Sequence, residues 1–324
     1  ALDPANDQTT NAIEAVVSSG GYGPVGFAQS DDGRFALVGS SEGDGNEDGG
    51  TAISVIDLTR RNVVDVLHLS LGDGGKVPQG ADRLCAQLVA APSRIPHRLP
   101  DGGVGCFPDI NAIGVSGHYA LTANGGTDDV SVIDIQRAID GGLDVEVARV
   151  DVERGPWGLA VSPDGDLVAV TNRESAETGL EGNTISILDL ENAREGVSAV
   201  EVARVVVGTG DAALATRPFG LAFTPDGQRL VVANFRSNNV SLVDVRRALA
   251  GDEDAESARI PLSRPDGAPS RPRGVAITPD GRFAVISGGA RDAAGGGSLW
   301  IIDLDSAAAV AIVTGVGNEP YLLD

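Results

Sequence analysis

Three arginines recur at the entries of the repeated segments, each one or two residues before a proline that opens an apolar run. They are Arg154, Arg217 and Arg271, and Arg273 follows two residues after the last of them. A guanidinium group presents a planar fork of N–H donors that matches the oxygens of a carboxylate. If the fold brings these side chains together, they form a candidate anion-binding site. The alternative is that each arginine pairs with acidic residues of a neighbouring repeat.

Three asparagines end a second apolar run in three of the repeated segments. They are Asn124, Asn172 and Asn234. A ligand at this end of the repeats could be met by their amide groups. The alternative is that each side chain bonds the local backbone and holds the start of the following loop.

The segment DGNEDG at 44–49 matches the first half of a calcium-binding loop. Its spacing directs the oxygen-bearing side chains of Asp44, Asn46 and Asp48 toward one point, and the glycine permits a sharp bend. The EF-hand pattern fails at its twelfth position, where Val55 replaces the bidentate glutamate. Ca²⁺ is therefore a candidate cofactor, and a flexible acidic loop is the alternative.

The two cysteines, Cys85 and Cys106, lie in one non-repetitive stretch at about 72–109. A disulfide between them would stabilise this insertion by roughly 3 kcal/mol in the loop-entropy model and indicates an oxidising compartment. Two unrelated thiols are the alternative. The sequence starts Ala-Leu-Asp-Pro and contains no methionine, which predicts a removed leader and an extracellular, cell-surface or periplasmic protein.

The charge of the chain argues against two classes of partner. The formal net charge is −22 and Lys76 is the only lysine, so we expect no binding to nucleic acid or to an anionic membrane. No apolar run reaches the length of a membrane span.

The histidines are scattered and no nucleophile elbow, phosphate loop or haem-attachment motif is found, so the sequence supplies no catalytic residue.

The candidate residues belong to five similar segments. Each contains a strand-like apolar run, a turn that is Ser/Thr-Pro-Asp-Gly in its fullest form, and a second β-branched run, which together predict a hairpin. The segments run over 24–40, 111–124, 156–172, 218–234 and 272–288.

A third and a fourth strand are expected after each hairpin. Third strands such as TISILD at 184–189 and NVSLVD at 239–244 alternate with period two. Outer strands are expected, for example, at 63–69, 145–152 and 200–207. Four antiparallel strands repeated in this way predict an all-β protein, a β-propeller whose blades stack around an axis.

These repeats resemble the YVTN family of β-propeller repeats, with their Pro-x-Gly entry, Ser/Thr-Pro-Asp-Gly turn, Val-x-x-Asn strand and Val-Ser-Val-Ile-Asp strand. The resemblance covers almost the whole chain except the insertion. It implies the fold. Because that family contains surface-layer-like and periplasmic proteins of varied roles, it implies little about function.

The repeats predict a single domain over 1–324, with five complete blades and a split closing blade. The segment 11–17 is expected to be an isolated outer strand, and 319–324 an inner strand of the closing blade. The intact ring would have six or seven blades. Another chain could complete the closing blade.

Strand order places the long irregular loops at one end of the ring, together with Arg154, Arg217 and Arg271. We expect binding at this end. Trp157 and Phe219 are expected to pack between blades. The aspartates that end the third strands are expected to cap the following turns, and they are Asp57, Asp134, Asp189, Asp244 and Asp303.

The sequence supports three hypotheses for function. The first is an exported, non-enzymatic propeller that binds a protein or a glycan through these loops. The second is a lactonase-like hydrolase with its site at the mouth of the channel. The third is a propeller subunit of a larger complex, which could be a redox complex.

Overall fold

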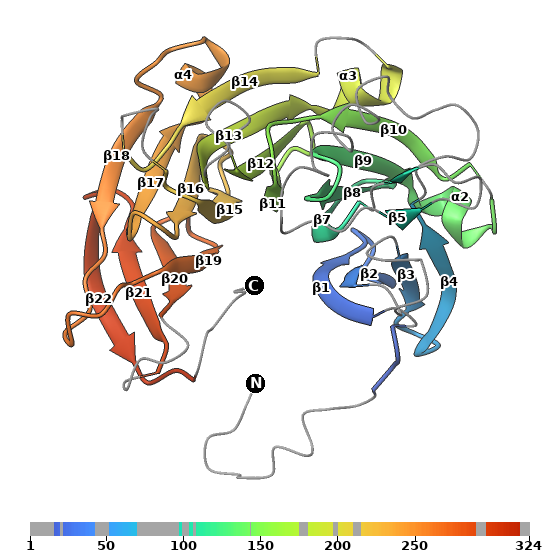
Figure 1. Cartoon of the computed structure of the whole chain (residues 1–324), viewed down its shortest axis with the longest axis horizontal. Coiled ribbons are helices and arrows are strands. Elements are labelled where there is room, and N and C mark those ends of the chain that lie inside the picture. The colour runs from blue at the N-terminus through green and yellow to red at the C-terminus, as the bar shows by residue number, and fades with distance from the viewer. Residues whose placement is uncertain are drawn as a thin grey trace.

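The computed structural model describes residues 16–19, 22–42, 52–69, 97–98, 104–105, 108–142, 144–174, 181–196, 200–209, 215–289 and 296–317. Five four-stranded antiparallel sheets make up most of this part of the chain, and in each sheet the strands follow one another in sequence order. We call these sheets blades 1 to 5. Figure 1 shows them arranged in an arc, with the first strands near the centre and the fourth strands at the rim.

The strands agree with the predicted repeats. Blades 1 and 2 contain β1 (Tyr22–Gln29), β2 (Phe35–Glu42), β3 (Ala52–Asp57) and β4 (Asn62–His68), then β7 (Ile110–Ser116), β8 (Tyr119–Asn124), β9 (Asp129–Asp134) and β10 (Glu146–Asp151). Blade 3 contains β11 (Pro156–Val161), β12 (Leu167–Glu174), β13 (Glu181–Asp189) and β14 (Glu201–Val206). Blades 4 and 5 contain β15 (Pro218–Phe223), β16 (Arg229–Asn234), β17 (Asn239–Asp244) and β18 (Glu256–Pro261), then β19 (Pro272–Ile277), β20 (Phe283–Gly288), β21 (Ser298–Asp303) and β22 (Ala308–Thr314). A short pair, β5 (His97–Arg98) with β6 (Val104–Gly105), lies in the insertion.

The hydrophobic core lies between neighbouring blades. Ile185 and Ile187 of blade 3, for example, belong to one buried cluster with Leu221 and Leu230 of blade 4. Alternate residues of a strand point to opposite faces of its sheet, so each blade contributes one apolar face to the blade before it and one to the blade after it. Blade 1 and blade 5 are the two ends of the arc in Figure 1.

The Ser/Thr-Pro-Asp-Gly quartets form the expected turns between first and second strands. In blade 4 the Thr224 hydroxyl donates to Asp226 Oδ1 over 2.5 Å, and the Gly227 N–H donates to the Thr224 carbonyl over 2.8 Å. The Thr224 hydroxyl and the backbone N–H of Gln228 stabilise the ionised carboxylate and lower the pKa of Asp226. We call this end of each blade the turn end, and the opposite end, where the first strands begin, the entry end.

The aspartates that end the third strands do cap the segments after them. Asp57 and Asp303 accept backbone N–H bonds from the next turn. Three others are N-caps of short helices that the sequence patterns did not predict. Asp134, Asp189 and Asp244 cap α2 (Ile135–Ile139), α3 (Leu190–Glu195) and α4 (Val245–Leu249). Each helix buries two apolar residues, and none of the helices in the described residues has the length and apolarity to cross a membrane.

Part of the predicted closing blade lies outside the described residues. Of the segment 11–17, only Val16 and Val17 are described and they form no strand, and the segment 319–324 is not described.

Candidate functional site

The residue that precedes each entry proline, or its counterpart Ile110 in blade 2, has a left-handed backbone. The φ values are 60° at Gly23, 53° at Asp109, 61° at Gly155, 50° at Arg217 and 44° at Arg271. A left-handed backbone costs a residue with a side chain roughly 1–2 kcal/mol that glycine does not incur. Blades 4 and 5 therefore carry an arginine, and blade 2 an aspartate, at a position where glycine would be less strained.

Three aromatic side chains form a continuous run at the entry end of blades 3 and 4. The ring centroids of Trp157 on β11 and Phe219 on β15 are 4.8 Å apart. Phe219 in turn stacks on Phe235, the residue after β16, with centroids 5.7 Å apart. The prediction that Trp157 and Phe219 pack between blades is confirmed.

Arginines surround both ends of this aromatic run. The guanidinium carbons of Arg217, Arg271 and Arg273 lie 5.4, 5.7 and 5.2 Å from the centroid of the Phe235 ring. The guanidinium carbon of Arg173 lies 4.0 Å from the Trp157 ring. These distances place all four cations within the range of cation–π attraction. We call these four arginines and the three rings the arginine–aromatic cluster.

The fold thus brings together two of the three predicted arginines. Arg217 and Arg271 meet at Phe235, although Arg154 has no contact with that ring among the described residues. Arg154 is half-buried, and its Nε atom is buried without a hydrogen-bond partner in the described part of the chain.

Arg173 and Phe235 were not among the residues that the repeats predicted for the site. Each directly follows one of the predicted asparagines, Asn172 or Asn234, and each donates its backbone N–H to the carbonyl of a left-handed entry residue. Arg173 bonds Gly155 and Phe235 bonds Arg217, both over 3.1 Å. The signal in the sequence was the residue after Asn172 and Asn234, which is large in both blades.

The three predicted asparagines are fully buried. Each Nδ2 donates to side chains of the third strand of the same blade, and Asn234, for example, bonds Asn239 Oδ1 over 2.9 Å and Ser241 Oγ over 2.7 Å. Asn124 and Asn172 make the equivalent bonds. In this arrangement the amide nitrogens join second to third strands, so contact between these amides and a ligand stays a prediction.

A second repeated pattern, not among the predicted site residues, begins the fourth strands of blades 2, 3 and 4. It reads EVAR at 146–149, EVAR at 201–204 and ESAR at 256–259. A β-bulge between the first and third residue of each pattern changes the strand parity, so the glutamate and the arginine reach the same side. Arg149 bonds Glu146 over 2.7 Å, and the other two arginines bond their glutamates likewise.

Blade 2 adds a buried carboxylate to this pattern. Asp129 is 1% exposed and accepts a hydrogen bond from Asn124 Nδ2 over 2.7 Å. Its Oδ2 atom lies 3.7 Å from Arg149 Nη1. Loss of solvation raises the pKa of Asp129 from 3.8 to about 6, even though Arg149 and the Asn124 bond favour its ionised form. Blade 4 has the neutral Asn239 at the equivalent position, which makes the same bond to Asn234.

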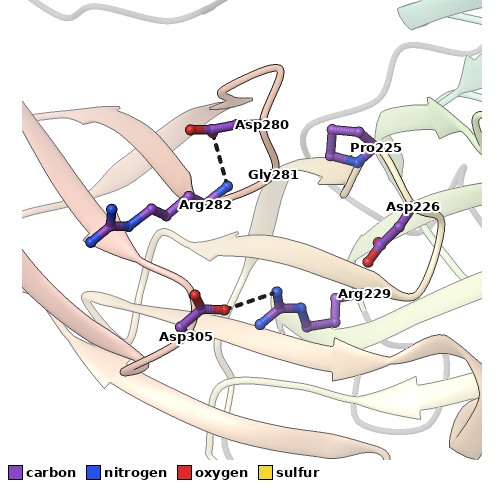
Figure 2. Close-up of a pocket in the computed structure, with 7 residues that line it drawn as sticks. All are labelled: Pro225, Asp226, Arg229, Asp280, Gly281, Arg282 and Asp305. Atoms are coloured by element: carbon purple, nitrogen blue, oxygen red, sulfur yellow. Dashed lines mark hydrogen bonds and ion pairs between the residues drawn. The ribbon is translucent and has the colours of Figure 1, made fainter.

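A pocket of about 660 Å³ lies at the turn end, between blades 4 and 5. Figure 2 shows its lining residues, which are Pro225, Asp226, Arg229, Asp280, Gly281, Arg282 and Asp305. Arg229 Nη1 donates to the Leu304 carbonyl over 2.7 Å, and Arg229 lies 3.8 Å from Asp305. These bonds cross from blade 4 to blade 5, so the pocket's charged side chains contribute to the junction, and the pocket lies opposite the end where we expected binding.

The predicted metal and disulfide residues lie outside the described residues. They are Asp44, Asn46, Asp48, Cys85 and Cys106. Within the described ranges, no cluster of three or more His, Cys, Asp and Glu side chains could hold a metal ion.

Comparisons with known proteins identify the fold and no family. No protein-family model matches the chain, and no curated protein matches it. Among solved structures, a chain of Kuenenia stuttgartiensis hydrazine synthase is similar with a TM-score of 0.56 and 20% identity, over 87% of this chain and 65% of that one. This chain therefore spans just under two thirds of that neighbour's length.

Two further solved structures are similar at lower identity. A chain of a mitotic checkpoint complex has a TM-score of 0.59 and 12% identity over 93% of this chain and 70% of its own length. A functionally unknown protein from Desulfotomaculum acetoxidans DSM 771 has a TM-score of 0.53 and 13% identity over 91% and 74%. The five blades and these neighbours define the chain as a β-propeller.

Proposed function

We propose that this β-propeller is a non-enzymatic binding or scaffold protein that recognises a protein or glycan partner through its entry end. The observation that carries the proposal is the arginine–aromatic cluster, in which four cations from three successive blades gather on three linked rings. Arg271 is exposed and Arg217 is half-buried, so a partner can reach both. Binding sites commonly lie on the irregular segments that a rigid frame holds in place.

Further parts of the proposal rest on the sequence. We assign the repeats to the YVTN type, which the Thr-Pro-Asp-Gly turns and Val-Ser-x-Val/Ile-Asp strands support. We place the protein outside the cytoplasm, at the cell surface or in the periplasm, and assign Ca²⁺ to the loop at 44–49. A disulfide between Cys85 and Cys106 fits that location.

Steric blocking of each end tests the proposed function. Cysteines introduced at exposed Arg236 (entry end) or Asp305 (turn end), in a chain whose Cys85 and Cys106 are replaced by serine, would be coupled to a bulky polymer. Wild-type and labelled proteins are then applied to arrays of glycans and peptides. We expect the Arg236→Cys label to abolish retention and the Asp305→Cys label to leave it unchanged. Equal effects of both labels, or no specific retention at all, would contradict the proposal.

A role as a subunit of a larger complex is the second candidate, and the end blades favour it. On β1, Phe27 is 55% exposed, whereas its counterpart Leu221 on β15 is 7% exposed because blade 3 covers it. On β22, Val313 is 48% exposed, whereas its counterpart Ile260 on β18 is 3% exposed because blade 5 covers it. A β-rich partner that continues the blade packing would bury both apolar faces.

Native mass spectrometry of the protein isolated from its own cells tests the subunit role. We expect a co-purifying chain that is lost in Phe27→Ser, because a polar side chain disrupts the apolar contact. Leu249→Ser is the matched control, since Leu249 is an exposed apolar residue on α4, away from both end faces. A monomer in all three preparations would count against this candidate.

A further inference from the structure

We infer that blade 2 has a buried binding site for one water molecule, which bridges the carboxylate of Asp129 and the guanidinium group of Arg149. The site lies on one face of β8, β9 and β10, beside the EVAR pattern at 146–149. It contains no residue of the arginine–aromatic cluster, so it does not depend on the proposed function.

Strand register brings the polar side chains of this site to one face of the blade. Asn124 on β8 pairs with Asp129 on β9, and Ser131, two residues further along β9, pairs with Arg149 on β10. Residues two apart in a strand point to the same side, and paired residues of neighbouring strands do so too. Accordingly, Asn124 Nδ2 donates to Asp129 Oδ1 over 2.7 Å and to Ser131 Oγ over 2.8 Å.

Three atoms of this group are buried and have no hydrogen-bond partner in the described part of the chain. They are Asn124 Oδ1, Asp129 Oδ2 and Arg149 Nη2. Asp129 Oδ2 lies 3.7 Å from Arg149 Nη1, which is too far for a direct hydrogen bond. Buried polar groups of folded proteins find hydrogen-bond partners, and water commonly bridges two polar groups at such a separation.

Blade 4 shows that an oxygen atom fits at the equivalent place. There Ser241 is paired as Ser131 is, and its hydroxyl donates to Glu256 Oε1. In blade 2 the equivalent Glu146 accepts instead from Arg149 Nε over 2.7 Å. The Ser131 hydroxyl accepts from Asn124, and its proton has no acceptor among the described residues. We expect the water oxygen to lie where blade 4 has the glutamate oxygen.

The chemistry of the three unpartnered atoms selects water over an ion. Arg149 Nη2 needs an acceptor, whereas the Asp129 and Asn124 oxygens need donors. A water molecule meets all three needs, and about three hydrogen bonds is the usual number for a buried water. A cation would lie against the guanidinium group and leave Nη2 unpaired, and an anion would lie against the Asp129 carboxylate.

A high-resolution crystal structure of the wild type tests the site directly. We expect a water oxygen about 2.7–3.2 Å from Arg149 Nη2, Asp129 Oδ2 and Asn124 Oδ1. A direct hydrogen bond between Arg149 and Asp129 with no solvent density beside it would overturn the inference. Density with oxygen ligands at roughly 2.3–2.6 Å would also overturn it, because those are the distances of a bound Ca²⁺.

Oxygen-17 relaxation dispersion tests the site in solution, because it counts the long-lived internal waters of a protein. The double variant Asp129→Thr/Arg149→Met removes both charged partners together and so leaves no unpaired buried charge. Threonine suits this position, since Thr184 holds it in blade 3 and accepts from Asn172 Nδ2 over 3.1 Å. We expect the double variant to lose one long-lived water relative to the wild type.

Asn239→Thr/Arg259→Met is the matched control, since it changes the equivalent residues of blade 4. The Arg259 side chain is 37% exposed and bonds Glu256, so we expect this variant to keep the wild-type number of long-lived waters. Thermal melting shows whether each variant is folded. An equal number of waters in the wild type and the folded blade 2 variant would overturn the inference, and if that variant does not fold, the crystal structure of the wild type decides.

Discussion

Gly220→Ala is expected to lower the free energy of unfolding by about 3 kcal/mol or more, because a methyl group cannot fit between blades 4 and 5. A Cβ atom at Gly220 would lie 2.2 Å from the backbone carbonyl oxygen of Arg273 and 3.2 Å from its carbonyl carbon. These are backbone atoms of β19 and cannot turn aside as a side chain could. The inner strands β15 and β19 would have to move apart, and the arginine–aromatic cluster at the same junction would be displaced with them.

Equilibrium denaturation measures this effect, and Gly267→Ala is the control. Gly267 has a left-handed φ of 72°, and nothing lies within 4 Å of a Cβ built on it, so alanine there meets only the backbone penalty of roughly 1–2 kcal/mol. If Gly220→Ala were no more destabilising than this control, the close approach of the inner strands in solution would be wrong. Gly158, whose Cβ would lie 2.2 Å from the Phe219 carbonyl oxygen, is expected to behave like Gly220.

The stability of the wild type is expected to fall, relative to Asp129→Asn, as the pH rises from about 4 to above 6. The folded state raises the pKa of Asp129 from 3.8 to about 6, so the folded protein holds this proton more tightly than the unfolded chain. The stabilisation of the folded state by the proton on Asp129 is therefore fully present below pH 3.8 and is lost as the pH rises through about 6. The difference between those two values corresponds to at most about 3 kcal/mol.

Asn239 of blade 4 shows that asparagine fits at this position. The Asn124 amide bonds Asp129 Oδ1 over 2.7 Å, and the Asn234 amide bonds Asn239 Oδ1 over 2.9 Å. Denaturation of the wild type and of Asp129→Asn at several pH values measures the difference between their free energies of unfolding. The exposed carboxylates titrate in both proteins, so their effect cancels in this difference. Parallel stability curves for the wild type and Asp129→Asn would refute the raised pKa.

The fold could be predicted from the sequence because the patterns that specify its turns and strands involve residues close together in the chain. The Thr224-Pro225-Asp226-Gly227 turn forms from four consecutive residues, and period-two alternation marks the strands on either side. The same local chemistry predicted that Asp244 would cap the segment after it. Helix α4 was missed because five residues are too few to show a helical period, and it is held by the burial of Val245 and Ala248 against the blades.

The candidate site was only partly predictable for a different reason. The sequence indicated Arg217 and Arg271 as equivalent residues of successive repeats, and it indicated Phe219 as an inter-blade residue. Whether two such arginines point to one ring, to acidic partners or to solvent depends on how far one blade is rotated from the next, which no local pattern specifies. Arg154 stands one position before Gly155, the blade 3 counterpart of Arg217, and it does not contact that ring among the described residues. The tertiary structure decided that Arg217 and Arg271 meet at Phe235, because only the packing of blade on blade brings residues so distant in the chain to the same ring.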